Sequence, residues 1–120
     1  MTRDPYAGRE QTKVKHFILK RYLQALAFKL LPSTDLAYVD GFSGPWESRT
    51  EAFHDSSFMI AIQVLLDAQR KINEQTNRQR RVRCFFCETD SAAFAQLQAA
   101  VVPFHRPDQG FEVRTFHGKF

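Results

Sequence analysis

The stretch LAYVDGFSGPW, from Leu36 to Trp46, decides the expected fold of this chain. In it an apolar run ends at Asp40 and passes into a turn that holds two glycines and a proline. Such a run is typical of a parallel strand buried on both faces, and glycines let the backbone approach a ligand where the strand ends. Ligands of open α/β sheets bind beyond the carboxyl ends of strands, beside the helix after the first turn. The stretch therefore predicts a nucleotide-type pocket beyond Asp40.

The residues before this strand predict a helix that lies along the sheet. A polar lead-in over residues 1–11 precedes the helix, which begins at Thr12 and is stopped by Pro32. Its expected apolar row, with Leu19 and Leu23 beside it, consists of Val14, Ile18, Tyr22, Leu26 and Leu30.

A second helix follows the glycine turn. Residues 55–57 (Asp-Ser-Ser) offer N-cap oxygens, and residues 58–66 are apolar almost all round. A helix that is apolar on every side is buried, so we expect this one to lie between the sheet and the first helix. It becomes polar from Asp67 and frays toward Asn77.

The rest of the chain predicts a strand at 82–87, a helix at 92–102 capped by Asp90 or Ser91, and a strand at 111–116. The right-handed crossover rule arranges such strands as a parallel sheet in the order 3-2-1. We therefore predict an α/β fold, the N-terminal half of a Rossmann-like three-layer α/β/α sheet. Residues 1–120 are interpreted as one partial domain whose other half is missing, because strand one would otherwise expose an edge.

Composition excludes several classes of protein. With 43% hydrophobic and 25% charged residues, the chain is of ordinary globular type. It lacks the apolar core of a signal peptide and any apolar run of about 18 residues, so we expect a cytoplasmic protein without a membrane partner. The net charge of +4 and the arginines at 78, 80, 81 and 83 allow a nucleic acid partner, although a solvated loop is the favoured interpretation.

No metal site is predicted. Cys84 and Cys87 have CxxC spacing, but they flank two phenylalanines inside a strand, whereas a redox pair begins a helix and a zinc site needs two further ligands nearby. We interpret both as core thiols. The four histidines show no i,i+4 pairing.

Two acids follow adjacent predicted strands, and they indicate the ligand. Glu88 ends the second strand, where a carboxylate can accept two hydrogen bonds from the hydroxyls of a ribose. Asp40 would repel a pyrophosphate, but it suits a cofactor that carries a sulfonium and an amino group. The pair therefore favours S-adenosylmethionine over a dinucleotide. Turn capping by Asp40 and solvation of Glu88 are the structural alternatives.

Three segments also resemble the three-Cys-motif partner protein family: YVDGFSGPWES (38–48), DSSFMIAIQVLLDA (55–68) and VRCFFCETD (82–90). These bacterial proteins are similar to class I adenosylmethionine-dependent methyltransferases and are named for a neighbouring three-cysteine protein of radical-enzyme type. The resemblance covers residues 12–120 and implies the cofactor-binding residues Asp40, Gly41, Phe42, Ser43, Gly44 and Glu88. Trp46 departs from the family's third glycine, and Lys119 stands where many relatives have an acid.

The leading hypothesis is the N-terminal part of a methyltransferase-like protein that binds S-adenosylmethionine. Its catalytic residues would lie beyond Phe120, and the three-cysteine radical-type protein would be a partner. The alternative is a non-catalytic interaction module that binds a protein or nucleic acid through its basic patch or exposed sheet edge. A nicotinamide enzyme is disfavoured by the incomplete glycine pattern.

Overall fold

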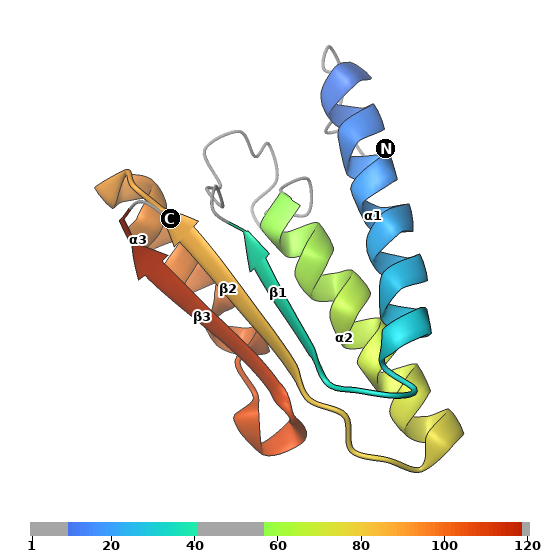
Figure 1. The fold of residues 1–120 in the computed structure, drawn as a ribbon. Helices are drawn as coiled ribbons and strands as arrows, with labels where there is room; N and C mark the ends of the chain where they lie inside the picture. The colour runs from blue at the N-terminus through green and yellow to red at the C-terminus, as the bar shows by residue number, and fades with distance from the viewer. Residues whose placement is uncertain (1–9, 41–56, 119–120) are drawn as a thin grey trace, which may run out of the picture.

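The structure is a computed structural model that describes residues 10–40 and 57–118. Helices and strands alternate in this part of the chain, as predicted (Figure 1). They are α1 (Glu10–Leu30), β1 (Leu36–Asp40), α2 (Ser57–Thr76), β2 (Val82–Glu88), α3 (Ser91–Val101) and β3 (Phe111–His117), with the short 3₁₀ turns η1 (Val102–Phe104) and η2 (Pro107–Gln109) before β3.

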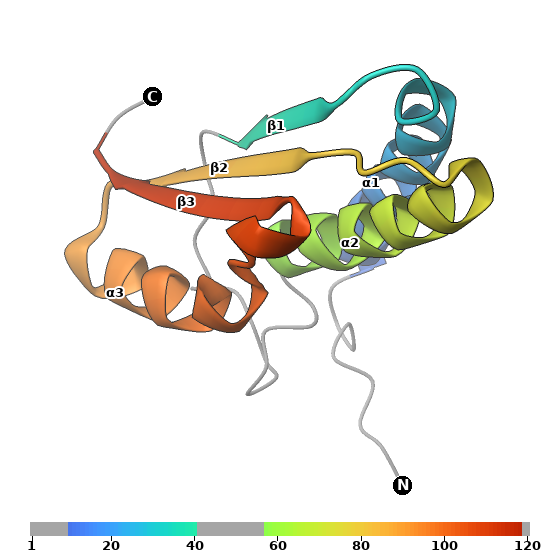
Figure 2. The same cartoon turned by 90° about the horizontal axis from the view of Figure 1, so that it is seen from below.

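The three strands form a parallel sheet in the order β1-β2-β3, which confirms the predicted order. Both crossovers run in the same direction, so α2 and α3 lie against the same face of the sheet (Figure 2). Helix α1 packs against α2. The described residues thus form a mixed α/β layer that is compatible with a Rossmann-like fold. Their helices lie on one side of the sheet (Figure 2), whereas the predicted α/β/α arrangement has helices on both sides.

Strand β1 is not buried on both faces, and that prediction is wrong for the described residues. Its side chains alternate between half-buried and exposed, and Val39 is 49% exposed. The reason is that the helices among the described residues cover one side of the sheet (Figure 2), and alternate side chains of β1 point to the other side. We call that side the open face, and it carries Ala37, Val39, Arg83, Phe85, Cys87, Glu112, Arg114 and Phe116, of which Cys87 alone is buried.

The hydrophobic core lies between the covered face of the sheet and α2. Helix α2 is buried between sheet and α1, as predicted, and Phe58, Ile62 and Leu65 are fully buried on it. Phe86 of β2 joins the layers, since its ring lies edge-on to Phe58 at 6.1 Å and to Tyr38 at 6.2 Å. Such edge-to-face pairs add to the free energy gained by burial.

Helix α1 presents a different row to the core than the sequence predicts. Val14, Ile18 and Tyr22, expected on the apolar row, are each more than half exposed, whereas Leu23 and Ala27 are buried. Apolar residues occur on two sides of this helix, so periodicity alone does not select one. The small side chain of Ala27 suits a close helix–helix contact with α2.

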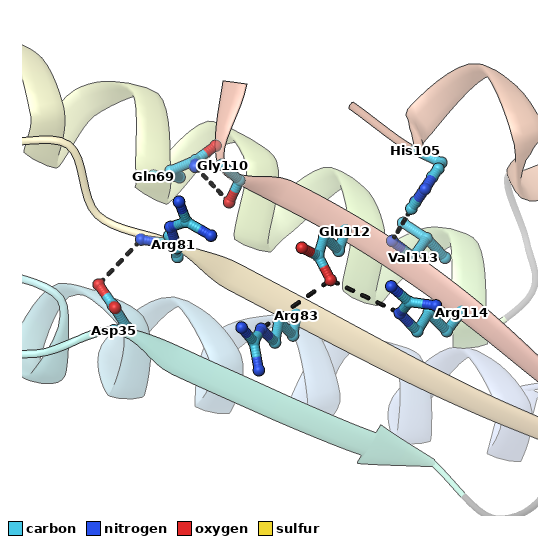
Figure 3. Close-up of polar contacts among 9 residues, drawn as sticks. All are labelled: Asp35, Gln69, Arg81, Arg83, His105, Gly110, Glu112, Val113 and Arg114. Carbon is cyan, nitrogen blue, oxygen red and sulfur yellow. Dashed lines mark hydrogen bonds and ion pairs between the residues drawn. The ribbon is translucent and has the colours of Figure 1, made fainter. Parts of the chain in front are cut away.

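The amino end of the sheet is held by one buried amide. Gln69 of α2 is 4% exposed, and its Nε2 donates to the carbonyl oxygens of Arg80 at 2.9 Å and Gln109 at 3.2 Å. It also donates to the carbonyl oxygen of Gly110 at 3.0 Å (Figure 3). Gly110 has φ +78°, and a Cβ there would lie 3.1 Å from the Arg80 oxygen. Glycine is therefore required where β3 begins.

We expect Gln69→Leu to lower the free energy of unfolding by about 2–3 kcal/mol. The Arg80 carbonyl would lose its donor while remaining in a buried region, and an unpaired buried acceptor costs about 1–3 kcal/mol. Urea denaturation followed by circular dichroism measures the effect. Gln63→Leu is the matched control, because Gln63 is exposed on the same helix. Equal shifts of the two denaturation midpoints would contradict this role of Gln69.

Candidate functional site at the carboxyl edge of the sheet

The carboxyl ends of the three strands meet at one edge of the sheet (Figure 1). Asp40 ends β1 and Glu88 ends β2, as predicted, and Asp40 pairs with Phe86, two residues before Glu88. Side chains two positions apart on a strand share a face, so both acids lie on the helix-covered side. Usual strand spacing and rise separate their Cα atoms by about 8 Å.

Glu88 is a buried carboxylate, only 8% exposed, and therefore not the solvated strand-end acid of the alternative interpretation. Its Oε1 accepts from the backbone N–H of Asp90 at 3.0 Å, and its carbonyl accepts from the N–H of Gly118 at 2.9 Å. The bond from Asp90 fixes the orientation of the side chain, and the bond from Gly118 holds the backbone of Glu88. The hydrogen bond to the carboxylate within the described residues is made by Oε1, which leaves the other oxygen, Oε2, to accept from a ligand.

The turn between β2 and α3 is built by helix capping. Asp90 is the N-cap of α3, as predicted, and its Oδ2 accepts from the Ala93 N–H at 2.8 Å. Because the Asp90 N–H also donates to Glu88, the cap and the buried acid form one rigid unit. This unit places the amino end of α3 beside the carboxyl edge.

Asp40 lies beside the ring of Tyr38 on the same side of β1. The pKa of Tyr38 is raised to about 12, first by burial and then by the negative charges of Asp40 and Cys84. Like any tyrosine it is a neutral hydrogen-bond donor at neutral pH, and it lies next to a half-buried carboxylate.

The structure adds His117 to this edge, which sequence reasoning did not single out. His117 pairs with Glu88 in the sheet register, and its ring stacks on Phe94 at 4.9 Å. Its Nε2 lies 3.1 Å from the Thr89 carbonyl oxygen and 3.4 Å from the Ser91 hydroxyl oxygen. His117 directly follows the predicted strand at 111–116, and this position at the end of a third parallel strand could have marked it in the sequence as a residue of the carboxyl edge.

This arrangement can bind and orient a ligand, and none of its side chains within residues 10–40 and 57–118 is an activated nucleophile. A carbonyl oxygen only accepts, so the His117 Nε2 must carry a proton to bond to Thr89 and cannot act as the base for Ser91. Among the described residues no cluster of three or more His, Cys, Asp or Glu side chains could bind a metal.

The two cysteines are free and buried, which confirms their prediction as buried thiols. They are three positions apart on β2 and so lie on opposite faces of the sheet, where they cannot pair with each other. Burial raises the pKa of the Cys84 thiol to about 12.

The Cys84 shift predicts a loss of stability in alkali. Below about pH 9 the Cys84 thiol is protonated in both the folded and the unfolded chain. Between about pH 9 and pH 12 it ionises in the unfolded chain while it stays protonated in the folded protein. The free energy of unfolding therefore falls by up to about 1.4 kcal/mol per pH unit in this range. Urea denaturation at pH 8 and at pH 10.5 measures this effect. At pH 8, Cys84→Ala should have a lower free energy of unfolding than the unchanged chain. From pH 8 to pH 10.5, that free energy should fall by about 2 kcal/mol less in Cys84→Ala than in the unchanged chain. Equal losses would contradict the buried neutral thiol.

Several predicted site residues lie outside the described part of the chain. They are Gly41, Phe42, Ser43 and Gly44 of the cofactor turn, together with Trp46 and Lys119. A hollow of about 250 Å³ opens elsewhere, at the amino end of β1 and β2, between Leu36, Arg81 and Arg83. The carboxyl edge is the better site for a nucleotide-like ligand, because strand-end acids and a helix terminus converge there.

Fold and edge together define a mixed α/β protein with a parallel, Rossmann-like layer and two acids at the carboxyl ends of neighbouring strands. Comparison with protein-family models, curated proteins and solved structures finds no match to this chain. Within the described residues, no helix is both long and apolar enough to cross a membrane.

Proposed function

We propose that this chain binds S-adenosylmethionine at the carboxyl edge of its sheet, as the N-terminal part of a methyltransferase-like protein of the three-Cys-motif partner type. The observation that carries the proposal is the buried Glu88 carboxylate, which keeps one oxygen for a ligand on the same side of the sheet as Asp40. The resemblance of three sequence segments to that family supports it.

The chemistry of the two acids fits this cofactor. The free oxygen of Glu88 accepts from ribose hydroxyls, and its bond to Asp90 holds the acceptor in place before the ligand arrives. The negative charge of Asp40 favours the cationic sulfonium and the amino group of the methionine part. The turn at residues 41–44 is proposed to let the backbone approach the ligand closely.

Bound S-adenosylmethionine supplies an electrophilic methyl group for transfer to a nucleophile. The chain's own contribution is to bind the cofactor and hold its orientation, which is how proximity and alignment lower a barrier. Groups that bind the methyl acceptor are proposed to lie after Phe120, and the partner is proposed to be a neighbouring three-cysteine radical-type protein.

Calorimetric titration of the chain with S-adenosylmethionine and S-adenosylhomocysteine tests the proposal. We expect both to bind, and Asp40→Asn to weaken binding about tenfold, since hydrogen bonds to a charged group contribute about 1.5–3 kcal/mol. Asp108→Asn is the matched control, because Asp108 is exposed in η2 at the other end of the sheet. Absence of binding, or an equal effect of the control, means that the proposal is wrong.

The second candidate function, an interaction module built on the arginines at 78–83, needs revision. The Nη2 of Arg80 donates to the Pro32 carbonyl oxygen at 2.8 Å, so this side chain serves the fold and is not available to a partner. Arg81 and Arg83 remain exposed, and they lie next to the open face.

A further inference from the structure

The open face of the sheet has the composition of a binding surface and not of a buried interface. Phe111 and Val113 of β3 are buried on the covered face, whereas Arg114 and Phe116 on the open face are exposed. A strand buried on both faces would be apolar throughout, and β3 instead alternates. Sequence alternation therefore indicates that this face contacts water or a polar partner.

A row of charges crosses the middle of the open face. Glu112 of β3 lies 3.5 Å from Arg114 and 3.9 Å from Arg83 of β2 (Figure 3). Covering this row with an apolar helix would remove three charges from water, which costs several kcal/mol per ion unless every charge is well paired. One carboxylate for two guanidinium groups leaves the row with a net positive charge.

On this face, arginine side chains are followed by an aromatic ring along both β2 and β3. Arg81, directly before β2, is spaced by two from Arg83, and Arg83 is spaced by two from Phe85 on β2. Arg114 and Phe116 are spaced by two on β3, so all five point to one side. Phe116 is 58% exposed, a large value for a phenylalanine in a strand. Each strand thus presents guanidinium groups followed by a ring.

The hollow of about 250 Å³ lies at the arginine end of this surface. Asp35, Leu36, Ala37, Arg81 and Arg83 form its walls. The Asp35 carboxylate accepts from the backbone N–H of Arg81 at 3.0 Å (Figure 3). The guanidinium group of Arg81 has no hydrogen-bond partner in the described part of the chain, so it can bind an anion.

We propose that the open face binds single-stranded nucleic acid. Arg81, Arg83 and Arg114 would contact phosphates, and Phe116, with the half-buried Phe85, would stack against unpaired bases. Exposed rings on a sheet beside a cationic track are the two features that bind single strands, because every base has a flat face. A duplex hides its base faces and would leave the rings unused.

Charge also argues against a second copy of this chain as the occupant. In a symmetric contact the same patch meets itself, so the arginines of one open face would approach those of the other. A polyanion removes this repulsion. The proposal does not depend on the cofactor site, because Asp40 and Glu88 lie on the covered side of the sheet.

Fluorescence anisotropy with a labelled 15-nucleotide oligo-dT tests the proposal. We expect binding that weakens with salt, with a slope of log K against log salt of about −0.7 for each phosphate contact. Arg81→Ala with Arg114→Ala should weaken binding at least tenfold and reduce the slope by about 1.4. Arg83 is left unchanged in this double variant, so Glu112 keeps an ion-pair partner.

Phe116→Ala should weaken binding about tenfold without changing the salt slope, because stacking involves no counterion release. The control is Lys13→Ala with Lys20→Ala, which removes two exposed charges from α1. Circular dichroism checks that all variants fold.

The proposal is overturned by any of three results: no binding, an equal effect of the lysine and arginine pairs, or no effect of Phe116→Ala. Equally tight binding of polyglutamate or of a 15-base-pair duplex also overturns it, since those results would indicate a general attraction for polyanions. Binding of S-adenosylmethionine is measured in a separate titration. A failure of nucleic acid binding therefore does not affect the proposed cofactor site, and a failure of cofactor binding does not affect this proposal.

Discussion

Phe86→Ala is expected to destabilise the chain by about 3–5 kcal/mol, the usual cost of removing a phenylalanine from a packed core. Phe86 is fully buried in the central strand, and its ring contacts Phe58 of α2 and Tyr38 of β1. The substitution therefore leaves a cavity where three elements meet. Domains are stable by about 5–15 kcal/mol, so the loss is a large part of the total. Thermal and urea denaturation measure it.

Phe116→Ala is the matched control for this prediction. The same atoms are removed from a neighbouring strand, but Phe116 lies exposed on the open face, so the free energy of unfolding should change by less than about 0.5 kcal/mol. Phe86→Leu should fall between the two, because leucine refills part of the cavity. Similar losses for Phe86→Ala and Phe116→Ala would show that the core does not lie on the covered face.

Local patterns predicted most of the fold. Branched and aromatic residues marked β2 and β3, Pro32 marked the region where α1 ends, and the acid before Ser91 marked the start of α3. Strand order followed from the handedness of crossovers, which is independent of side-chain detail. These features depend on residues close together in the chain, so periodicity and capping rules capture them.

The burial of individual side chains was harder to predict, because it depends on which helices and strands pack against each other. The run of residues 36–39 is apolar, yet its alternate side chains are exposed, since the described helices cover a single face. Helix α1 has apolar residues on two sides, and contact with α2 selects the side of Leu23 and not that of Ile18. Neither outcome is encoded in a single element.

For the candidate site, strand-end acids were the residues that sequence could locate. Asp40 and Glu88 occupy the predicted edge, but the bond from the Asp90 N–H to Glu88 was not foreseeable, because it needs the geometry of the turn. His117 was overlooked for a similar reason, since only the register of β3 on β2 brings it opposite Glu88. Contacts between distant segments are the part that needed the structure.

Glu88→Gln is expected to weaken S-adenosylmethionine, S-adenosylhomocysteine and adenosine alike, each by about 10–100-fold. The amide keeps an oxygen to accept from the Asp90 N–H, so α3 should begin as before, but it replaces the free carboxylate oxygen by a donor. All three ligands carry the same ribose, and a hydrogen bond to a charged acceptor contributes about 1.5–3 kcal/mol. Isothermal titration calorimetry measures the three affinities.

The pattern across ligands separates the two acids. Asp40→Asn should weaken the two methionine-bearing ligands and leave adenosine nearly unchanged, because the charge of Asp40 is assigned to the amino and sulfonium groups. Glu74→Gln makes the same substitution at an exposed position on α2 and should change no affinity. If Glu88→Gln spared adenosine while weakening S-adenosylmethionine, Glu88 would not bind the ribose. Since the Glu88 carboxylate is already oriented by Asp90 without a ligand, its loss should act on affinity and not on folding.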